Sequence, residues 1–227
     1  MYFYDLHVHS CLSPCADDDM SPANICAMAR LKGLDIISLT DHNTAGNLES
    51  CMEAAAREGL LFVPGMELCT REEVHLLAYF PDLTGALAAG KVIRTLLPGI
   101  PNRPERFGRQ LLMDSRDLVL GEEDALLIGA LDLGLEQACD LVRNHGGVPV
   151  PAHIHRGHGL VRVLGFVPPD AGFHTVETAP GEALPSGCRA IHSSDAHQLG
   201  MISEPLYKLP SGKDIASLLR FMALPAN

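Results

Sequence analysis

The first 67 residues alternate between segments that favour β-strands and segments that favour α-helices. The runs at 2–9, 34–39 and 60–63 are rich in aromatic or branched apolar residues and have the length of strands. Between them, the segments at 21–33 and 48–59 have helical spacing, and each closes on a glycine. This order of elements predicts a parallel sheet with helices packed outside it.

The remainder of the chain continues the pattern less regularly. Residues 73–80 alternate in character and predict a strand, with His75 on the face opposite Val74 and Leu76. We expect one domain over residues 1–227, within which 81–146 is a mainly helical insertion. The other expected elements are helices near 85–96, 122–128 and 134–144, strands at 148–152, 173–178 and 188–192, and a last helix capped by Ser211.

Side chains that can bind metals recur where the expected strands end. His7 and His9 are two residues apart in a strand and therefore point to the same face. In α/β barrels the functional side chains gather at the carboxyl ends of the strands. Mixed imidazole and carboxylate ligands suit zinc, manganese or iron better than magnesium or calcium. The candidate ligands at or near strand ends are His7, His9, His42, Glu67, His75, His153, Asp195 and His197. Four other histidines are expected to be core or surface residues rather than ligands: His145, His158, His174 and His192.

Charge and composition indicate which partners the protein can bind and in which compartment it is expected. The formal net charge of −11 opposes binding to long duplex nucleic acid. No apolar run approaches the roughly 18 residues that a membrane span needs, and the first residues do not resemble a secretory signal. The seven cysteines include no C-x-x-C pair, which favours reduced thiols over a disulfide framework. We therefore expect a cytoplasmic protein with no membrane partner.

The candidate ligands lie in six short motifs along the chain. These are Asp5-Leu6-His7-Val8-His9-Ser10, Thr40-Asp41-His42, Gly65-Met66-Glu67, Val74-His75-Leu76-Leu77, Pro151-Ala152-His153 and Ser194-Asp195-Ala196-His197. Taken together and in this order, they resemble the motifs of the PHP (polymerase and histidinol phosphatase) family. The resemblance spans nearly the whole chain and implies a distorted (β/α)7 barrel of the TIM type. It also implies a site for two or three divalent metals (zinc, manganese or iron) and phosphoesterase chemistry.

The resemblance also assigns the ligands to individual metals. Glu67 would bridge a first and a second metal. The first would be held by His7, His9, Glu67 and Asp195, the second by Glu67, His75 and His153, and the third by Asp17, His42 and His197.

Two departures from the family pattern affect these assignments. The family usually has a single Asp-Gly in the loop after the first strand, whereas this chain has Asp17-Asp18-Asp19; counting back from Ser21-Pro22 favours Asp17 as the ligand. The proline that commonly follows the equivalent of His153 is replaced by Ile154-His155-Arg156. Arg156 is expected to bind phosphate, because a guanidinium matches phosphate oxygens bidentately, and a surface ion pair is its alternative role.

The expected reaction is metal-assisted hydrolysis of a phosphate ester. A hydroxide that bridges two metals would attack phosphorus in line, while Arg156 neutralises the phosphoryl oxygens. The leaving group would take a proton from Asp41 or from a metal-bound water. Asp41, Glu67 and Arg156 are thus the expected catalytic residues. The expected substrate is a small phosphorylated molecule, with a nucleotide or a short oligonucleotide among the candidates.

Three other functions remain open. The first is a nuclease acting on oligonucleotide ends, with the basic residues between Lys91 and Arg116 as a rim for the anionic substrate; a solvated helix face is the alternative reading of those residues. The second is a non-catalytic module that keeps metals for stability or for a partner. The third is C–N hydrolysis, which is disfavoured because no lysine accompanies the ligands at a strand end. Cys11 and Cys15 flank the site in sequence; packing or incidental placement is expected for them, with metal ligation as the alternative.

Overall fold

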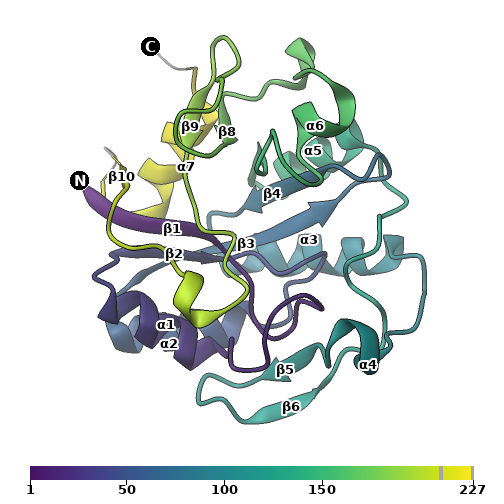
Figure 1. Ribbon diagram of the computed structural model, residues 1–227, viewed down its shortest axis with the longest axis vertical. Coiled ribbons are helices and arrows are strands. Elements are labelled where there is room, and N and C mark those ends of the chain that lie inside the picture. Colours follow the sequence, from purple (N-terminus) through teal and green to yellow (C-terminus); the bar gives the residue numbers. More distant parts are fainter. Residues whose placement is uncertain (210–211, 226–227) are drawn as a thin grey trace.

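The computed structural model describes residues 1–209 and 212–225. Its main layer is a curled sheet of six strands in the order β10-β1-β2-β3-β4-β7 (Figure 1). The strands of this sheet are β1 (Tyr2–Val8), β2 (Ile36–Leu39), β3 (Leu61–Cys69), β4 (His75–Tyr79), β7 (Val148–Pro151) and β10 (Lys208–Leu209). A parallel pair, β8 (Thr175–Glu177) and β9 (Arg189–Ile191), lies next to β7, and β5 (Leu111–Met113) forms a hairpin with β6 (Val119–Glu122).

Strands β1, β2 and β3 run parallel, as expected, but β4 is antiparallel to both β3 and β7. The reason is the short connection between β3 and β4, which a tight turn closes through the Thr70 amide and the Val74 carbonyl oxygen, 2.9 Å apart. Two parallel neighbours would need a crossover of a dozen or more residues, whereas antiparallel neighbours need only a turn. The α/β barrel-like class is therefore confirmed, with the regular parallel order broken at β4.

Helices cover the sheet from outside and at one end. In Figure 1, α1 and α2 lie side by side below the sheet, and α7 lies with β8 and β9 on the opposite side. The helices are α1 (Pro22–Leu31), α2 (Leu48–Glu58), α3 (Leu83–Leu96), α4 (Pro104–Phe107), α5 (Leu135–Asn144), α6 (Leu160–Leu164) and α7 (Ile215–Ala223), with single 3-10 turns at Pro169–Ala171 and Leu199–Met201. No helix in the described part of the chain is long and apolar enough to cross a membrane.

The helix ends follow the expected local signals, with one exception outside the described residues. The Ser21 side chain caps α1 by accepting from the Asn24 amide at 3.4 Å. Gly59 ends α2 with φ = +70°, a left-handed conformation that glycine adopts without a Cβ clash. Ser211, the expected cap of the last helix, lies outside the described residues; the carboxylate of Asp214 caps α7, accepting from the Ser217 amide at 2.8 Å.

The segment at 81–146 is only partly the helical insertion that was expected. Helices α3 and α5 confirm two of its three expected helices, but residues 122–128 contain no helix. Before that segment, β5 and β6 form a hairpin that was not expected. Its turn is built by Asp114, whose Oδ1 accepts from the Arg116 and Leu118 amides at 2.8 and 2.9 Å. The hairpin bonds back to the loop after β1, because the Leu111 amide donates to the Cys11 carbonyl at 2.8 Å. The prediction of a single domain stays a prediction.

Two buried clusters hold the layers together. The larger packs apolar residues of α1, α2, α3 and α5 against the outer side of the sheet. The smaller joins β1, β2, β3, β4, β7 and β9 to the apolar side of α7, and includes Leu6, Tyr79 and Leu218. The buried Tyr79 hydroxyl donates to the Leu6 carbonyl oxygen at 2.9 Å. This bond fixes the end of β1, immediately before His7.

Candidate metal centre

The end of β1 presents His7 and His9 to one point. The Nε2 atoms of the two rings are 3.1 Å apart, and both side chains are fully buried. The strand end pairs with the segment that carries Asp195 and His197, because the His9 amide donates to the Ala196 carbonyl at 2.9 Å and the Ala196 amide to the His7 carbonyl at 3.2 Å. This pairing joins the first and last motifs of the chain. Two imidazoles and a carboxylate are thereby brought together from positions almost 190 residues apart.

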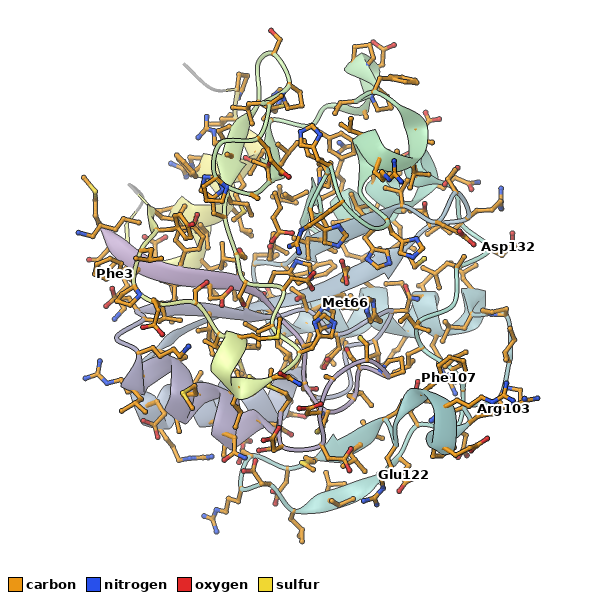
Figure 2. All side chains as sticks on the ribbon, viewed as in Figure 1. Phe3, Met66, Arg103, Phe107, Glu122 and Asp132 are labelled. Carbon is orange, nitrogen blue, oxygen red and sulfur yellow. The ribbon has the colours of Figure 1, made fainter. Side chains whose placement is uncertain are left out.

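Glu67 is the centre of the site. The sequence suggested that Glu67 follows the third strand, but it lies inside β3. Its carboxylate is buried. Met66, the residue before it in β3, is labelled near the middle of the molecule in Figure 2. Imidazole nitrogens from five residues lie within 3.4 Å of the Glu67 carboxylate oxygens: His75 at 2.9 Å, His42 and His153 at 3.1 Å, His9 at 3.3 Å and His7 at 3.4 Å.

The spacing of these atoms fits shared cation ligation. Two ligands of a tetrahedral zinc, each about 2.0–2.1 Å from the metal, are about 3.3 Å apart. The Nε2 atoms of His7 and His9 lie 3.3 and 3.4 Å from Asp195 Oδ1, and 3.4 and 3.3 Å from the two Glu67 oxygens. The two imidazole nitrogens and Asp195 Oδ1 therefore have the spacing of ligand atoms around one cation, and each nitrogen has a Glu67 oxygen within 3.4 Å.

Two further imidazoles point toward Glu67 without hydrogen-bonding it. The Nδ1 atoms of His42 and His75 are buried and have no hydrogen-bond partner among the described residues, yet they lie 3.1 and 2.9 Å from Glu67 oxygens. A buried polar nitrogen without a partner is costly. A cation between nitrogen and carboxylate would satisfy both lone pairs, and the donor set of imidazoles with carboxylates suits a divalent transition metal. The residues present therefore fit the metals that the sequence predicted.

The charges of the cluster shift the ionisation of its members in opposite directions. Burial would raise the pKa of Glu67, but the histidines around it, His75 foremost, lower that pKa well below its usual range. Burial would likewise lower the pKa of His7, but the carboxylates of Glu177, Glu67 and Asp195 raise it well above normal. Burial, the largest cause, lowers the pKa of His42 well below its usual value; the imidazoles of His9, His75 and His197 act in the same direction, and Glu67 opposes them. His42 therefore stays neutral, as a metal ligand must.

Hydrogen bonds on the far side of each ring set which nitrogen faces the cluster. The His7 Nδ1 atom lies 3.0 Å from Oε2 of Glu177, so an ionised Glu177 accepts a hydrogen bond from Nδ1–H and leaves the Nε2 lone pair for ligation. The His9 Nδ1 atom lies 3.0 Å from Oγ of Ser13, whose own proton goes to Asp41 at 2.7 Å. The sequence did not indicate these roles of Glu177 and Ser13. The available signal was the position of Glu177 near the end of an expected strand, which resembles the position expected for Glu67.

The first testable consequence concerns Glu177. Replacing Glu177 with Gln is expected to lower the affinity for the bound cation about 10–100-fold, because an amide no longer enforces the tautomer of His7. Competition with a chromophoric chelator measures this affinity. The control is Glu136→Gln, a change at an exposed position on α5. An unchanged affinity in a folded Glu177→Gln protein would show that Glu177 does not orient His7 for cation binding.

The backbone is strained at two of the candidate ligands. His153 has φ = +26° and Asp195 has φ = +55°, both unusual for residues with a side chain. Such conformations persist where the surroundings enforce them, often at functional sites. At His153, the backbone amide donates to Glu177 at 2.9 Å, and the loop folds so tightly that a Cβ at Gly159 would lie 2.2 Å from the His153 carbonyl oxygen. The loop thus holds the His153 ring against Glu67.

A cavity of about 240 Å³ opens onto the cluster. Arg156 lines it with an exposed guanidinium 3.7 Å from Asp195, which is consistent with either a phosphate-binding role or the ion pair that was its alternative. His158 also lines it and stacks on His75 with ring centroids 4.7 Å apart. That His158 is a core or surface residue rather than a ligand stays a prediction. The full lining is His42, Glu67, His75, His153, Arg156, Gly157, His158, Asp195 and His197.

Two predicted site residues, Asp17 and Asp41, lie outside both the cavity lining and the group of side chains around Glu67. Asp17 is exposed and does not belong to the clusters of potential ligands, whereas the neighbouring Cys15 does. Asp41 is buried behind His9, and its oxygens accept from Ser10 and Ser13 at 2.6–2.7 Å. Asp41 therefore acts on the site through Ser13 and His9, and not by direct contact with a leaving group in the cavity.

The basic residues between Lys91 and Arg116 do not line the cavity either. Arg94 pairs with Glu123 and Arg109 with Glu122, both at 2.7 Å. Arg103 and Glu122 lie at the lower right of Figure 2, well away from Met66 and the cluster. The structure favours the interpretation of these residues as a solvated surface over a rim around the substrate.

Comparison with known proteins places this geometry in a family. Over 111 residues the chain is 32% identical to a 3′,5′-nucleoside bisphosphate phosphatase of Chromobacterium violaceum, covering 47% of this chain and 37% of that protein. Over 99 residues it is 29% identical to a 5′-3′ exoribonuclease of Haemophilus influenzae, covering 40% and 35%. The chain thus spans little more than a third of the length of either relative.

A solved structure and a family model extend the likeness. The structure of an amidohydrolase from Chromobacterium violaceum, determined with bound sulfate and no metal, superposes with a TM-score of 0.62 at 24% identity and covers 98% of this chain and 97% of that one. This likeness supports the fold over nearly the whole length. The family model described as PHP domain matches residues 5–128, more than half of the chain and the part that carries His7, His9, His42, Glu67 and His75. The chain therefore belongs to the PHP domain family.

Proposed function

We propose that the protein is a metal-dependent phosphoesterase that hydrolyses the phosphomonoester of a small, nucleotide-type molecule. One observation carries the proposal: five imidazoles surround the buried carboxylate of Glu67 beside a cavity that an arginine enters. Two divalent cations, zinc, manganese or iron, would share Glu67. His7, His9 and Asp195 would complete the first position, and His75 and His153 the second.

The chain's own residues bind and orient the reactants. Bound divalent cations polarise a phosphoryl oxygen and lower the pKa of a coordinated water, which makes a nucleophile available near neutral pH. Glu177 accepts a hydrogen bond from His7 Nδ1–H, and Ser13 Oγ accepts one from His9 Nδ1–H. Both Nε2 lone pairs are therefore directed at the cluster. Burial of His7, His9 and Glu67 keeps bulk water from competing for these ligands.

Arg156 binds the phosphate in this proposal. Arg156 lines the cavity, and about half of its side chain is exposed. Its guanidinium lies 3.7 Å from Asp195, which leaves its N–H groups available to a ligand. A guanidinium in that place can donate to two phosphoryl oxygens and oppose the charge that develops on them.

Replacing Arg156 with Ala is therefore expected to lower kcat/KM about 10²–10³-fold, comparable to the loss of one preorganised donor at a reacting oxygen. Steady-state kinetics on an aryl phosphate in the presence of added manganese measure the effect. Arg162→Ala is the matched control, because Arg162 is also exposed but lies outside the cavity lining. Equal activities of the two variants would leave Arg156 as a surface ion pair.

The size and charge of the site favour a small substrate. The cavity of about 240 Å³ is below the roughly 300–1,000 Å³ that drug-sized ligands occupy. The net charge of −11 also disfavours a long polyanion. The relative named as a 3′,5′-nucleoside bisphosphate phosphatase agrees with this choice.

The alternative is a nuclease acting on oligonucleotide ends, which the name of the exoribonuclease relative favours. Exclusion of long nucleic acid stays a prediction. A parallel assay of a nucleoside monophosphate, a nucleoside 3′,5′-bisphosphate, an end-labelled oligoribonucleotide and a simple amide separates the candidate reactions. We expect release of inorganic phosphate from a mononucleotide to have the highest kcat/KM. Faster shortening of the oligomer would establish the nuclease, and a folded, metal-loaded protein inert toward the whole panel would revive the non-catalytic module.

A further inference from the structure

The loop after β1 brings a thiol to one corner of the histidine–carboxylate site. Cys15 offers Sγ, and His9, His42 and His197 each offer a ring nitrogen, with all four ligand atoms within 4.8 Å of one another. The rings of His9 and His197 stack at 4.4 Å between centroids, and those of His9 and His42 lie at 4.6 Å. Of the seven cysteines, all of them in the described part of the chain, six are buried and Cys15 is exposed.

Hydrogen bonds fix the loop in the shape that places Cys15 there. The Cys11 amide donates to the Met20 carbonyl at 2.8 Å, which closes the loop, and the Asp17 amide donates to the His197 carbonyl at 3.0 Å. The second bond ties the backbone next to Cys15 directly to the segment of His197. It also leaves the Asp17 side chain exposed to solvent. The residue that the family pattern suggested as a ligand is thus turned outward, and the thiol two positions earlier lies among the imidazoles.

His42 joins this corner to the Glu67 centre. It is 3% exposed, and its Nδ1 atom, 3.1 Å from Oε2 of Glu67, has no hydrogen-bond partner among the described residues. His42 also belongs to the group of potential ligands that contains Cys15. We propose that Cys15, His42 and His197 form a third cation position, next to the two that share Glu67, and that its thiolate selects a thiophilic cation such as Zn²⁺ or Fe²⁺ over Mn²⁺ or Mg²⁺. His9 lies beside this position with its Nε2 already assigned to the first cation.

The chemistry of the three donors supports that selectivity. Thiolate and imidazole ligands favour zinc and iron, whereas manganese and magnesium prefer oxygen ligands. When the cation binds, the Cys15 thiol releases its proton to solvent as the bond from Sγ to the cation forms. Three protein ligands leave a fourth place open, which is typical of catalytic rather than structural zinc sites. The third position could therefore contact the substrate in the neighbouring cavity, which His42 and His197 line.

Cobalt substitution tests this inference without any activity measurement. The inference rests on the proposed metal centre at Glu67, so the titration must separate the Cys15 position from that centre. Apoprotein titrated with Co²⁺ is expected to bind three equivalents and to develop a near-ultraviolet sulfur-to-cobalt charge-transfer band. Cys15→Ser is expected to lose the band and one equivalent, whereas Asp17→Asn keeps both. Circular dichroism establishes that each variant is folded.

The outcomes are distinct. Two equivalents without a band in the unmodified protein would overturn the Cys15 position and leave the Glu67 centre standing, and no bound cobalt would remove both. Loss of the third equivalent in Asp17→Asn but not in Cys15→Ser would restore Asp17 as the ligand. Should Cys15→Ser fail to fold, X-ray absorption of the unmodified zinc protein decides, since a thiolate ligand places a sulfur about 2.3 Å from zinc. Spectra with nitrogen and oxygen neighbours alone would contradict the proposal.

Discussion

Replacing Glu67 with Gln is expected to lower kcat by about 10³-fold or more, because a bound cation contributes several kcal/mol to the transition state and each 1.36 kcal/mol is a factor of ten. The change keeps the shape of the side chain but removes its charge and one ligand oxygen. Nitrogens of five histidines lie within 3.4 Å of that carboxylate, so no other residue in the site has as many neighbours to lose. The change therefore affects both of the cation positions that are proposed to share Glu67.

Kinetics on an aryl phosphate and elemental analysis of the same samples measure the effect. We expect the Glu67→Gln protein to contain fewer cations per chain as well as to turn over more slowly. Glu53→Gln on α2 is the matched control, since Glu53 is exposed and carries the same charge. A folded Glu67→Gln protein with full activity and a full complement of metal would show that Glu67 holds no cation.

Removing the metal with a chelator is expected to abolish turnover and to lower Tm by about 10 °C. A ligand present at 1,000 times its Kd stabilises the folded state by about 4 kcal/mol, and each kcal/mol shifts Tm by about 2–4 °C in a chain of this size. The stabilisation lost is that of the buried cluster, in which the Nδ1 atoms of His42 and His75 then have no partner. Thermal unfolding with and without chelator measures the shift.

Two controls make that experiment specific. Adding back Zn²⁺, Mn²⁺ or Fe²⁺ after dialysis is expected to restore both Tm and activity, and the better-restoring cation identifies the metal that the site prefers. In Glu67→Gln, the chelator is expected to change Tm much less, because the variant has little metal to lose. An unchanged Tm in protein shown by elemental analysis to be metal-free would mean that the cluster is held together without cations.

The parts of the fold that sequence could predict are those with local signals. The β-α-β-α-β order up to Glu67 follows from apolar runs, a serine cap and closing glycines, each visible within a few residues. The spacing of His7 and His9 likewise predicts that both rings face one point, and the structure places their Nε2 atoms 3.1 Å apart. The antiparallel direction of β4 was also readable, since too few residues separate it from β3 for a crossover.

Other features depend on contacts between distant residues. Glu177 orients His7 from 170 positions away, and no local pattern distinguishes it from other glutamates at strand ends. The choice between Asp17 and Cys15 depends on how the loop bonds to the His197 segment, far along the chain. The hairpin of β5 and β6 was missed because its short strands carry a weak alternating signal, and the turn at Asp114 was the better indication.

Anomalous diffraction from crystals of the metal-loaded protein, recorded at the absorption edge of the bound element, locates the cations themselves. We expect anomalous peaks within bonding distance of Glu67, one of them shared with His7, His9 and Asp195 and another with His75 and His153. Peaks remote from Glu67, or a fully loaded crystal with no peak beside this carboxylate, would contradict this expectation.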